Sequence, residues 1–176
     1  KGLIFGGTDI LVNGITIGFG KYQGSNTNLA LGTNALNNNI SGLYNTSLGS
    51  NTLFNLTSGL SNIAMGEASL YNLTNGAGNI AIGRQSLQAT IAGADNIGIG
   101  DFSLTSMGTA YANIAIGKNA LYNLNTGNFN VAIGNSALVA TKGGNNTGIG
   151  YSVGTNLTTG TNNTIIGYNT GLGITT

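Results

Sequence analysis

One pentapeptide recurs along most of the chain: an asparagine, a hydrophobic residue or threonine, a residue that is nearly always small, an aliphatic residue and a glycine. Successive copies begin 17 residues apart, except for one step of 16 residues that we place in the turn at Gly143 and Gly144. The nine copies begin at Asn28, Asn45, Asn62, Asn79, Asn96, Asn113, Asn130, Asn146 and Asn163, and they end at Gly32, Gly49, Gly66, Gly83, Gly100, Gly117, Gly134, Gly150 and Gly167. Seventeen residues are too few for two helices and a turn, but they suit one coil of a solenoid.

Two further signals keep the same period. A leucine follows seven of the motif glycines by four residues, and Gly154 and Gly171 replace it in the last two units. A turn glycine follows most motif glycines by ten residues, as at Gly59 and Gly76. The leucines are Leu36, Leu53, Leu70, Leu87, Leu104, Leu121 and Leu138. Together the signals predict an all-β fold, a parallel β-solenoid of about nine coils over residues 28–176.

Each coil is expected to contain two short strands. The first is the pentapeptide, in which alternation places Ile80 and Ile82 on one face and Ala81 on the other. The second is the stretch around Ser86 and Leu87. We expect the Ile/Leu/Met column and the leucine column to line the interior of the coil. The column of small residues then requires a close neighbour, which is either the opposite wall of the same coil or another chain.

The most regular residues are predicted to be structural. The nine motif asparagines should stack into a ladder in which the side-chain amides hydrogen-bond from coil to coil. The nine motif glycines should form corners, because glycine adopts positive φ without steric cost. Neither column is expected to bind a ligand.

Residues 1–27 fit the repeat less well. A degenerate motif ends at Gly18, but it precedes Gly32 by 14 residues instead of 17. We interpret this segment as a leading coil, an N-terminal cap or a junction to a preceding element. The chain starts at Lys1 and stops inside a repeat, so we expect it to be a fragment of a longer protein.

Composition excludes several function classes. Charged residues make up 5% of the chain and the net charge is +1, which leaves no electrostatic footprint for nucleic acid. No run of 18 apolar residues exists that could form a transmembrane helix. His and Cys are absent, so histidine-based triads, thiol nucleophiles and the usual zinc sites are not available. Asp95 and Asp101 are close enough in sequence to test as a carboxylate pair, although solvated corner residues are the favoured interpretation. We expect no enzyme activity, no metal and no cofactor.

The tandem N-x-[AGS]-[IL]-G units resemble the head repeats of trimeric autotransporter adhesins of the YadA-like type. They are also similar to repeats in phage tail fibres, where such units follow a segment like Asp9–Gly18. The resemblance covers nearly the whole chain. It implies a homotrimer of three rolls side by side, located outside the cell or on a virion, which attaches to a glycan or protein receptor on a cell surface.

Other functions remain open at this stage. The chain could be the subunit of a self-assembling extracellular filament, because open coil ends expose strand edges. An ice-binding solenoid would need a regular threonine column. Thr147 and Thr164 share one position, but Ile or Val fills that position in most other units. Phe54, Tyr71 and Tyr122 share one position, directly after the ladder leucine. These three aromatic residues could stack on sugars, but packing at a subunit interface is favoured.

Overall fold

The structure is a computed structural model that describes residues 10–12, 15–18 and 27–176. The part of the chain that it describes is all-β. Asp9 and Gly14, which belong to the segment compared with tail fibres, lie outside the described residues. The strands are β1 (Ile10–Val12), β2 (Ile15–Gly18), β3 (Leu29–Gly32), β4 (Thr46–Leu48), β5 (Ile63–Met65), β6 (Ile80–Ile82), β7 (Ile97–Ile99), β8 (Ile114–Ile116), β9 (Val131–Ile133), β10 (Thr147–Ile149) and β11 (Thr164–Ile166).

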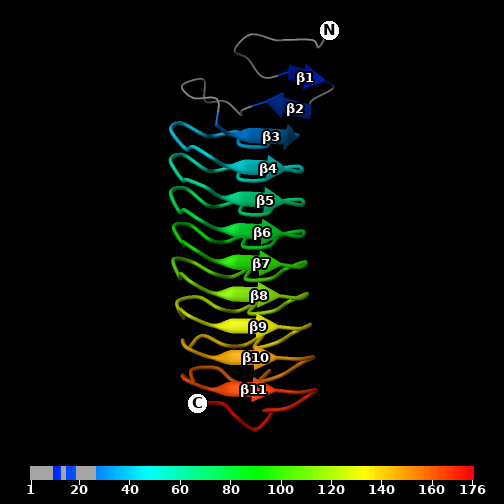
Figure 1. Cartoon of the computed structure of the whole chain (residues 1–176), viewed down its shortest axis with the longest axis vertical. Coiled ribbons are helices and arrows are strands. Elements are labelled where there is room, and N and C mark those ends of the chain that lie inside the picture. The colour runs from blue at the N-terminus through cyan, green and yellow to red at the C-terminus, as the bar shows by residue number, and fades with distance from the viewer. Residues whose placement is uncertain (1–9, 13–14, 19–26) are drawn as a thin grey trace.

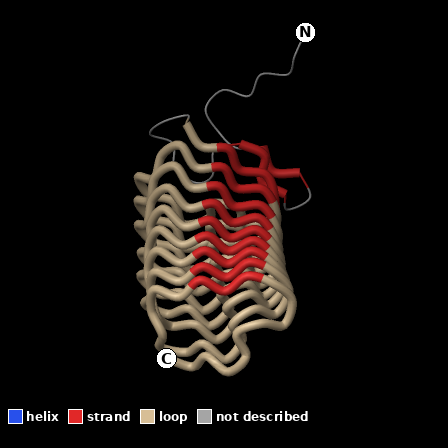
Figure 2. The backbone as a smooth tube through the Cα atoms, turned by 60° about the horizontal axis from the view of Figure 1, so that its bottom comes forward, coloured by secondary structure: helices blue, strands red, loops and turns tan. Residues whose placement is uncertain are grey.

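Nine of these strands form the parallel solenoid that the repeat predicts. Strands β3 to β11 pair with their sequence neighbours in parallel and in register, so that Ile80 lies opposite Ile97 and Ile97 lies opposite Ile114. Each strand contributes one rung to a continuous stack, which Figure 1 shows from the side. The strands occupy one side of the tube and the remaining walls are turns and loops (Figure 2).

The first two strands run in a different direction. β1 pairs antiparallel with β2, and β2 pairs antiparallel with β3 through Ile17 and Leu31. This pairing is unlike that of a coil in the repeat. It places β2 along the edge of β3 that the parallel stack would leave open (Figure 1).

The expectation of a second strand in each coil is wrong. The stretch around Ser86 and Leu87 is a turn, in which Gln85 and Leu87 both have left-handed backbone conformations with φ of 56° and 55°. Alternating left-handed residues cannot continue as an extended strand. The backbone nevertheless bonds from coil to coil here, since the Leu87 N–H donates to the Ser103 carbonyl at 2.9 Å.

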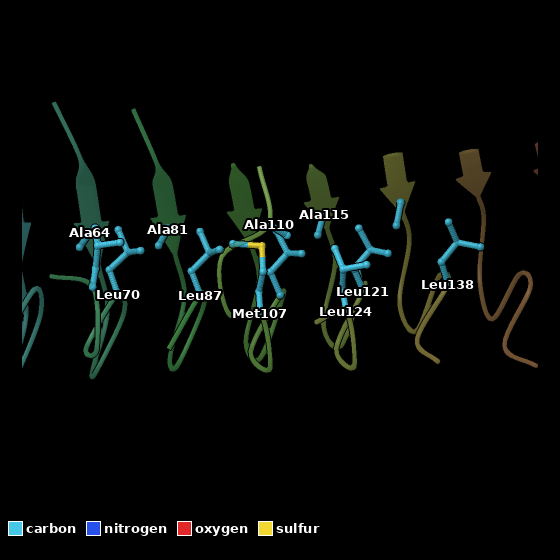
Figure 3. Close-up of a cluster of buried hydrophobic side chains, with 14 of the residues drawn as sticks. Ala64, Leu70, Ala81, Leu87, Met107, Ala110, Ala115, Leu121, Leu124 and Leu138 are labelled. Carbon is cyan, nitrogen blue, oxygen red and sulfur yellow. The ribbon is translucent and has the colours of Figure 1, made fainter. Parts of the chain in front are cut away.

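The assignment of the interior is only half right. The leucine column is fully buried, and Figure 3 shows Leu70, Leu87, Leu121 and Leu138 inside the coils. The Ile/Leu/Met column, however, points outward: Ile82 retains 37% of its accessible surface, whereas Ala81 beside it retains none. The strands therefore turn their small residues inward and their large aliphatic residues outward.

The narrowness of the coil explains this orientation. A Cβ atom added to Gly98 would lie 2.5 Å from the Ser86 Oγ, and one added to Gly148 would lie 2.6 Å from the Leu138 Cγ. The leucine turn thus packs directly against the strand and leaves room for little more than Ala, Ser or Gly. Of the two neighbours considered for the small column, the opposite wall of the same coil is the one present.

The coil of 16 residues leaves the stack intact. The Asn146 backbone N–H still donates to the Asn130 side chain at 3.0 Å, and the Asn130 amide still reaches a turn carbonyl, that of Gly143, at 3.0 Å. The deletion is absorbed in the turn, as expected for a surface connection.

Candidate functional site

The asparagine column is a buried hydrogen-bond ladder. The Oδ1 atom of Asn79 accepts from both the backbone N–H and the side-chain amide of Asn96, at 3.1 and 3.0 Å. The second amide hydrogen of Asn79 is directed to the Gly93 carbonyl at 2.8 Å. The same pattern joins the column from Asn28 to Asn163. Because both amide hydrogens and the oxygen are engaged inside the coil, the column has little capacity left for a ligand.

The corner glycines are needed for two reasons. Gly83 has a φ of 127°, a region that side chains rarely adopt. A Cβ atom at this residue would also lie 2.6 Å from the carbonyl carbon of Gly100 in the next coil. The corner thus stacks backbone directly on backbone, which leaves no space for a side chain or a ligand.

The three aromatic residues singled out from the sequence do not form one site. Phe54 and Tyr71 are half-buried and stack on each other, with ring centroids 5.1 Å apart and planes 5° apart. Tyr122 lies three coils beyond Tyr71 along the stack and lines a separate hollow with Phe102 and Lys118. Because the two stacked rings cover one face of each other, each has at most one face left for a sugar.

Other aromatic pairs were not anticipated. Tyr151 and Tyr168 stack with centroids 5.3 Å apart, and Tyr111 meets Phe129 edge to face at 5.2 Å. These side chains are more exposed than Phe54 and Tyr71. Tyr151 and Tyr168 are exactly one period apart in the repeat, which the sequence could have revealed.

The most unusual surface is the outer side of the sheet, which we call the sheet face. It consists of the residue after each ladder asparagine and the residue before each corner glycine. None of its residues is charged, and most are aliphatic. Its members are Leu29, Thr46, Ile63, Ile80, Ile97, Ile114, Val131, Thr147, Thr164, Leu31, Leu48, Met65, Ile82, Ile99, Ile116, Ile133, Ile149 and Ile166. Sequence reasoning missed this surface because it placed the second of these columns inside the coil.

The sheet face is continuous along the stack. In seven coils the side chain before the corner glycine retains at least 37% of its accessible surface. Ile116, Ile133 and Ile149 retain 37%, and Ile166 retains 65%. Nine coils spaced about 4.8 Å apart give a strip roughly 40 Å long. Contiguous apolar strips of this kind on a protein surface mark interaction sites.

A column of charged residues borders the sheet face, and each of these residues comes directly after a corner glycine. Glu67, Arg84, Asp101 and Lys118 occupy the same position in four successive coils, with alternating sign. Arg84 contacts Asp101 at 3.8 Å and lies over the Phe102 ring at 4.6 Å from its centroid. The side chains are half-exposed, so the column is a solvated ladder that avoids stacking like charges.

The two acids considered as a catalytic pair lie on either side of a strand. Asp95 precedes β7, while Asp101 follows it and accepts a hydrogen bond from the Arg84 backbone N–H at 3.0 Å. No group of three or more His, Cys, Asp or Glu side chains suited to a metal occurs within residues 27–176. None of the described segments forms a helix long and apolar enough to cross a membrane.

Comparison with known proteins finds no similar protein. No family model, no curated protein and no solved structure matches the chain. The function must therefore be argued from the surfaces described above.

The last surface is a groove on the wall of turns. It is an open hollow of about 950 Å³ that crosses the first four coils of the repeat. Asparagine, threonine and isoleucine side chains line it, and none of the lining residues is charged. The sequence interpretation did not include this groove.

Proposed function

We propose that this chain is a rod-forming segment of a homotrimeric surface fibre, of the kind used by tail fibres and adhesins for attachment to cells. The observation that carries the proposal is the uncharged, aliphatic sheet face. A solvated rod would not be expected to keep two adjacent, mostly aliphatic columns exposed along nine coils. A second copy of the chain offers the same flat strip, which makes the face self-complementary.

Three chains can bury this face in a closed assembly. If three sheets turn toward a common axis parallel to the rods, each strip contacts the other two and none is left over. Closed symmetry of this kind limits growth to a defined number of subunits. The number three follows the resemblance to trimeric head repeats. The apolar face supports burial between copies of the chain.

The hydrogen-bond pattern favours a stiff rod. The backbone, the asparagine ladder and the buried leucines repeat the same contacts from coil to coil, so each coil is held by both of its neighbours. Such a segment is suited to spacing or presenting a receptor-binding surface along a fibre. The proposed role is structural and requires no catalytic group.

A filament built by stacking coils end to end is disfavoured by one feature. The edge of β3, where another copy would add a parallel strand, is already paired with β2. Lateral association through the sheet face does not require this edge.

The experiment tests whether the sheet face is the interface, by comparing lysine substitutions of isoleucines inside and outside this face. The unheated chain should migrate as a trimer in SDS, and Ile99→Lys with Ile116→Lys should abolish that band, because two unpaired charges per chain would be buried. The matched control is Ile40→Lys with Ile91→Lys, which changes two exposed isoleucines outside the sheet face. Equal loss in both double variants would contradict the proposed interface.

A further inference from the structure

The groove on the wall of turns has two parallel polar rails. One rail is formed by Asn38, Asn55 and Asn72, which are one period apart and lie ten residues after their ladder asparagines. The amide of Asn38 donates to Asn55 at 3.2 Å, and that of Asn55 donates to Asn72 at 3.3 Å. Each amide in this rail therefore retains at least one N–H that is not used within the rail.

The second rail lies two residues further along each coil. The hydroxyls of Thr57 and Thr74 donate to main-chain carbonyls of the following coil, both at 3.0 Å. A threonine hydroxyl that donates to the backbone presents its oxygen lone pairs as acceptors. Between the rails, Leu56 and Leu73 point into the core and are fully buried.

The groove thus offers amide donors on one side and hydroxyl acceptors on the other, repeated about every 4.8 Å along the rod. An exposed isoleucine lies at each end of the threonine rail: Ile40 is 64% exposed and Ile91 is 53% exposed. A sugar ring carries hydroxyls that both donate and accept, together with apolar C–H faces. This combination matches two parallel rows of polar partners with an aliphatic side chain at each end of the second row.

The absence of charge narrows the ligand class. None of the residues that line the hollow is charged, so nothing here would compensate phosphate, sulfate or uronate groups. The hollow is open along its length, so a linear ligand can lie over several coils without being enclosed. The repeat of the rails along the axis favours a ligand that is itself a linear repeat.

We propose that this groove binds a neutral linear polysaccharide, with the sugar chain lying along the rod axis over the first four coils. The amide rail donates to sugar oxygens, the hydroxyl rail accepts from sugar hydroxyls, and Ile40 and Ile91 contact the C–H faces. The groove contains no residue of the sheet face, so the proposal does not rest on the trimer. A trimer would present three such grooves, which strengthens binding to a polymer through multivalency.

The test measures retention of the full chain on insoluble cellulose, chitin, xylan and mannan, with alginate as the anionic comparison. We expect retention on at least one neutral polymer and none on alginate. Thr57→Val should weaken that retention about tenfold, the loss expected for one hydrogen bond. Ala89→Tyr, which fills the groove, should abolish it.

The matched control is Thr158→Val. The Thr158 hydroxyl donates to the Thr175 carbonyl at 2.9 Å, the same contact that Thr57 makes, but it lies in a separate hollow with Lys142. Its replacement should leave retention unchanged, and circular dichroism should show equal folding of all three variants. The proposal is overturned if no neutral polymer retains the chain, if alginate is preferred, or if Thr158→Val has the effect expected of Thr57→Val.

Discussion

The side chain of Ile165 fills the space beside Gly154 that a leucine fills in the preceding coils. Ile165 is 6% exposed, and it stands in the column that holds Ala, Ser or Gly in every other coil. A Cβ atom added to Gly154 would lie 2.8 Å from the Ile165 Cδ1, and one added to Gly171 would lie 2.8 Å from its Cγ2. The core thus keeps its volume by exchanging a small residue and a large one across the coil.

This exchange predicts a coupled pair. Ile165→Ala should lower the free energy of unfolding by about 2–4 kcal/mol because it leaves a cavity. Gly154→Leu alone should destabilise by about 1–3 kcal/mol through overpacking. The double variant should cost less than the sum, as measured by guanidinium unfolding at a fixed protein concentration. Simple additivity would show that the two sites are independent.

The buried asparagine ladder predicts a large penalty for one missing amide. Asn79→Leu removes the acceptor for two donors of Asn96 and the donor for the Gly93 carbonyl. Leaving such groups buried without partners should cost about 3 kcal/mol or more. The matched control is Asn55→Leu, since Asn55 also accepts from one asparagine and donates to another between coils, but in exposed hydrogen bonds. A similar cost at both positions would contradict the importance of burial.

The corner stack predicts a strong effect from a single methyl group. Gly83→Ala should destabilise by more than about 2 kcal/mol, because it combines an unfavourable φ with a contact at 2.6 Å from the next backbone. Gly173→Ala is the control, since a Cβ atom there would meet nothing within 4 Å. The melting temperatures of the two variants give the comparison. Equal melting temperatures would mean that the corners of neighbouring coils can move apart without a loss of stability.

The charge column predicts a small and salt-dependent effect. Arg84→Glu places an acid between Glu67 and Asp101, whereas Arg84→Gln only removes the positive charge. We expect the two variants to differ by no more than about 1 kcal/mol at low salt, because the side chains are half-exposed. The difference should shrink in 1 M NaCl as the charges are screened. A difference that persists in high salt would indicate packing instead of charge.

Sequence periodicity was sufficient to predict the parallel stack and its register. It could not decide which face of each strand is buried, because alternation in Ile80, Ala81 and Ile82 is compatible with either. The decision depends on the width of the coil, which the opposite wall sets through Leu87. The left-handed backbone of Leu87 was also hidden, since leucine rarely adopts positive φ.

Some of the missed features had a trace in the sequence. Glycine replaces the ladder leucine at Gly154 and Gly171, and both adopt positive φ in the structure. These replacements were a sign that the position is a turn and not a strand. For the groove, the trace was the triplet Asn-Leu-Thr, which recurs at Asn55 and Asn72 with one period between them.

The central claim is that the sheet face is buried between copies of the chain. Sedimentation equilibrium of the 176-residue chain tests it most directly, since the mass does not depend on the shape of the rod. We predict a mass three times that of the 17.6 kDa chain over a range of concentrations. A mass of 17.6 kDa at every concentration would contradict the claim, because the aliphatic face would then remain in water.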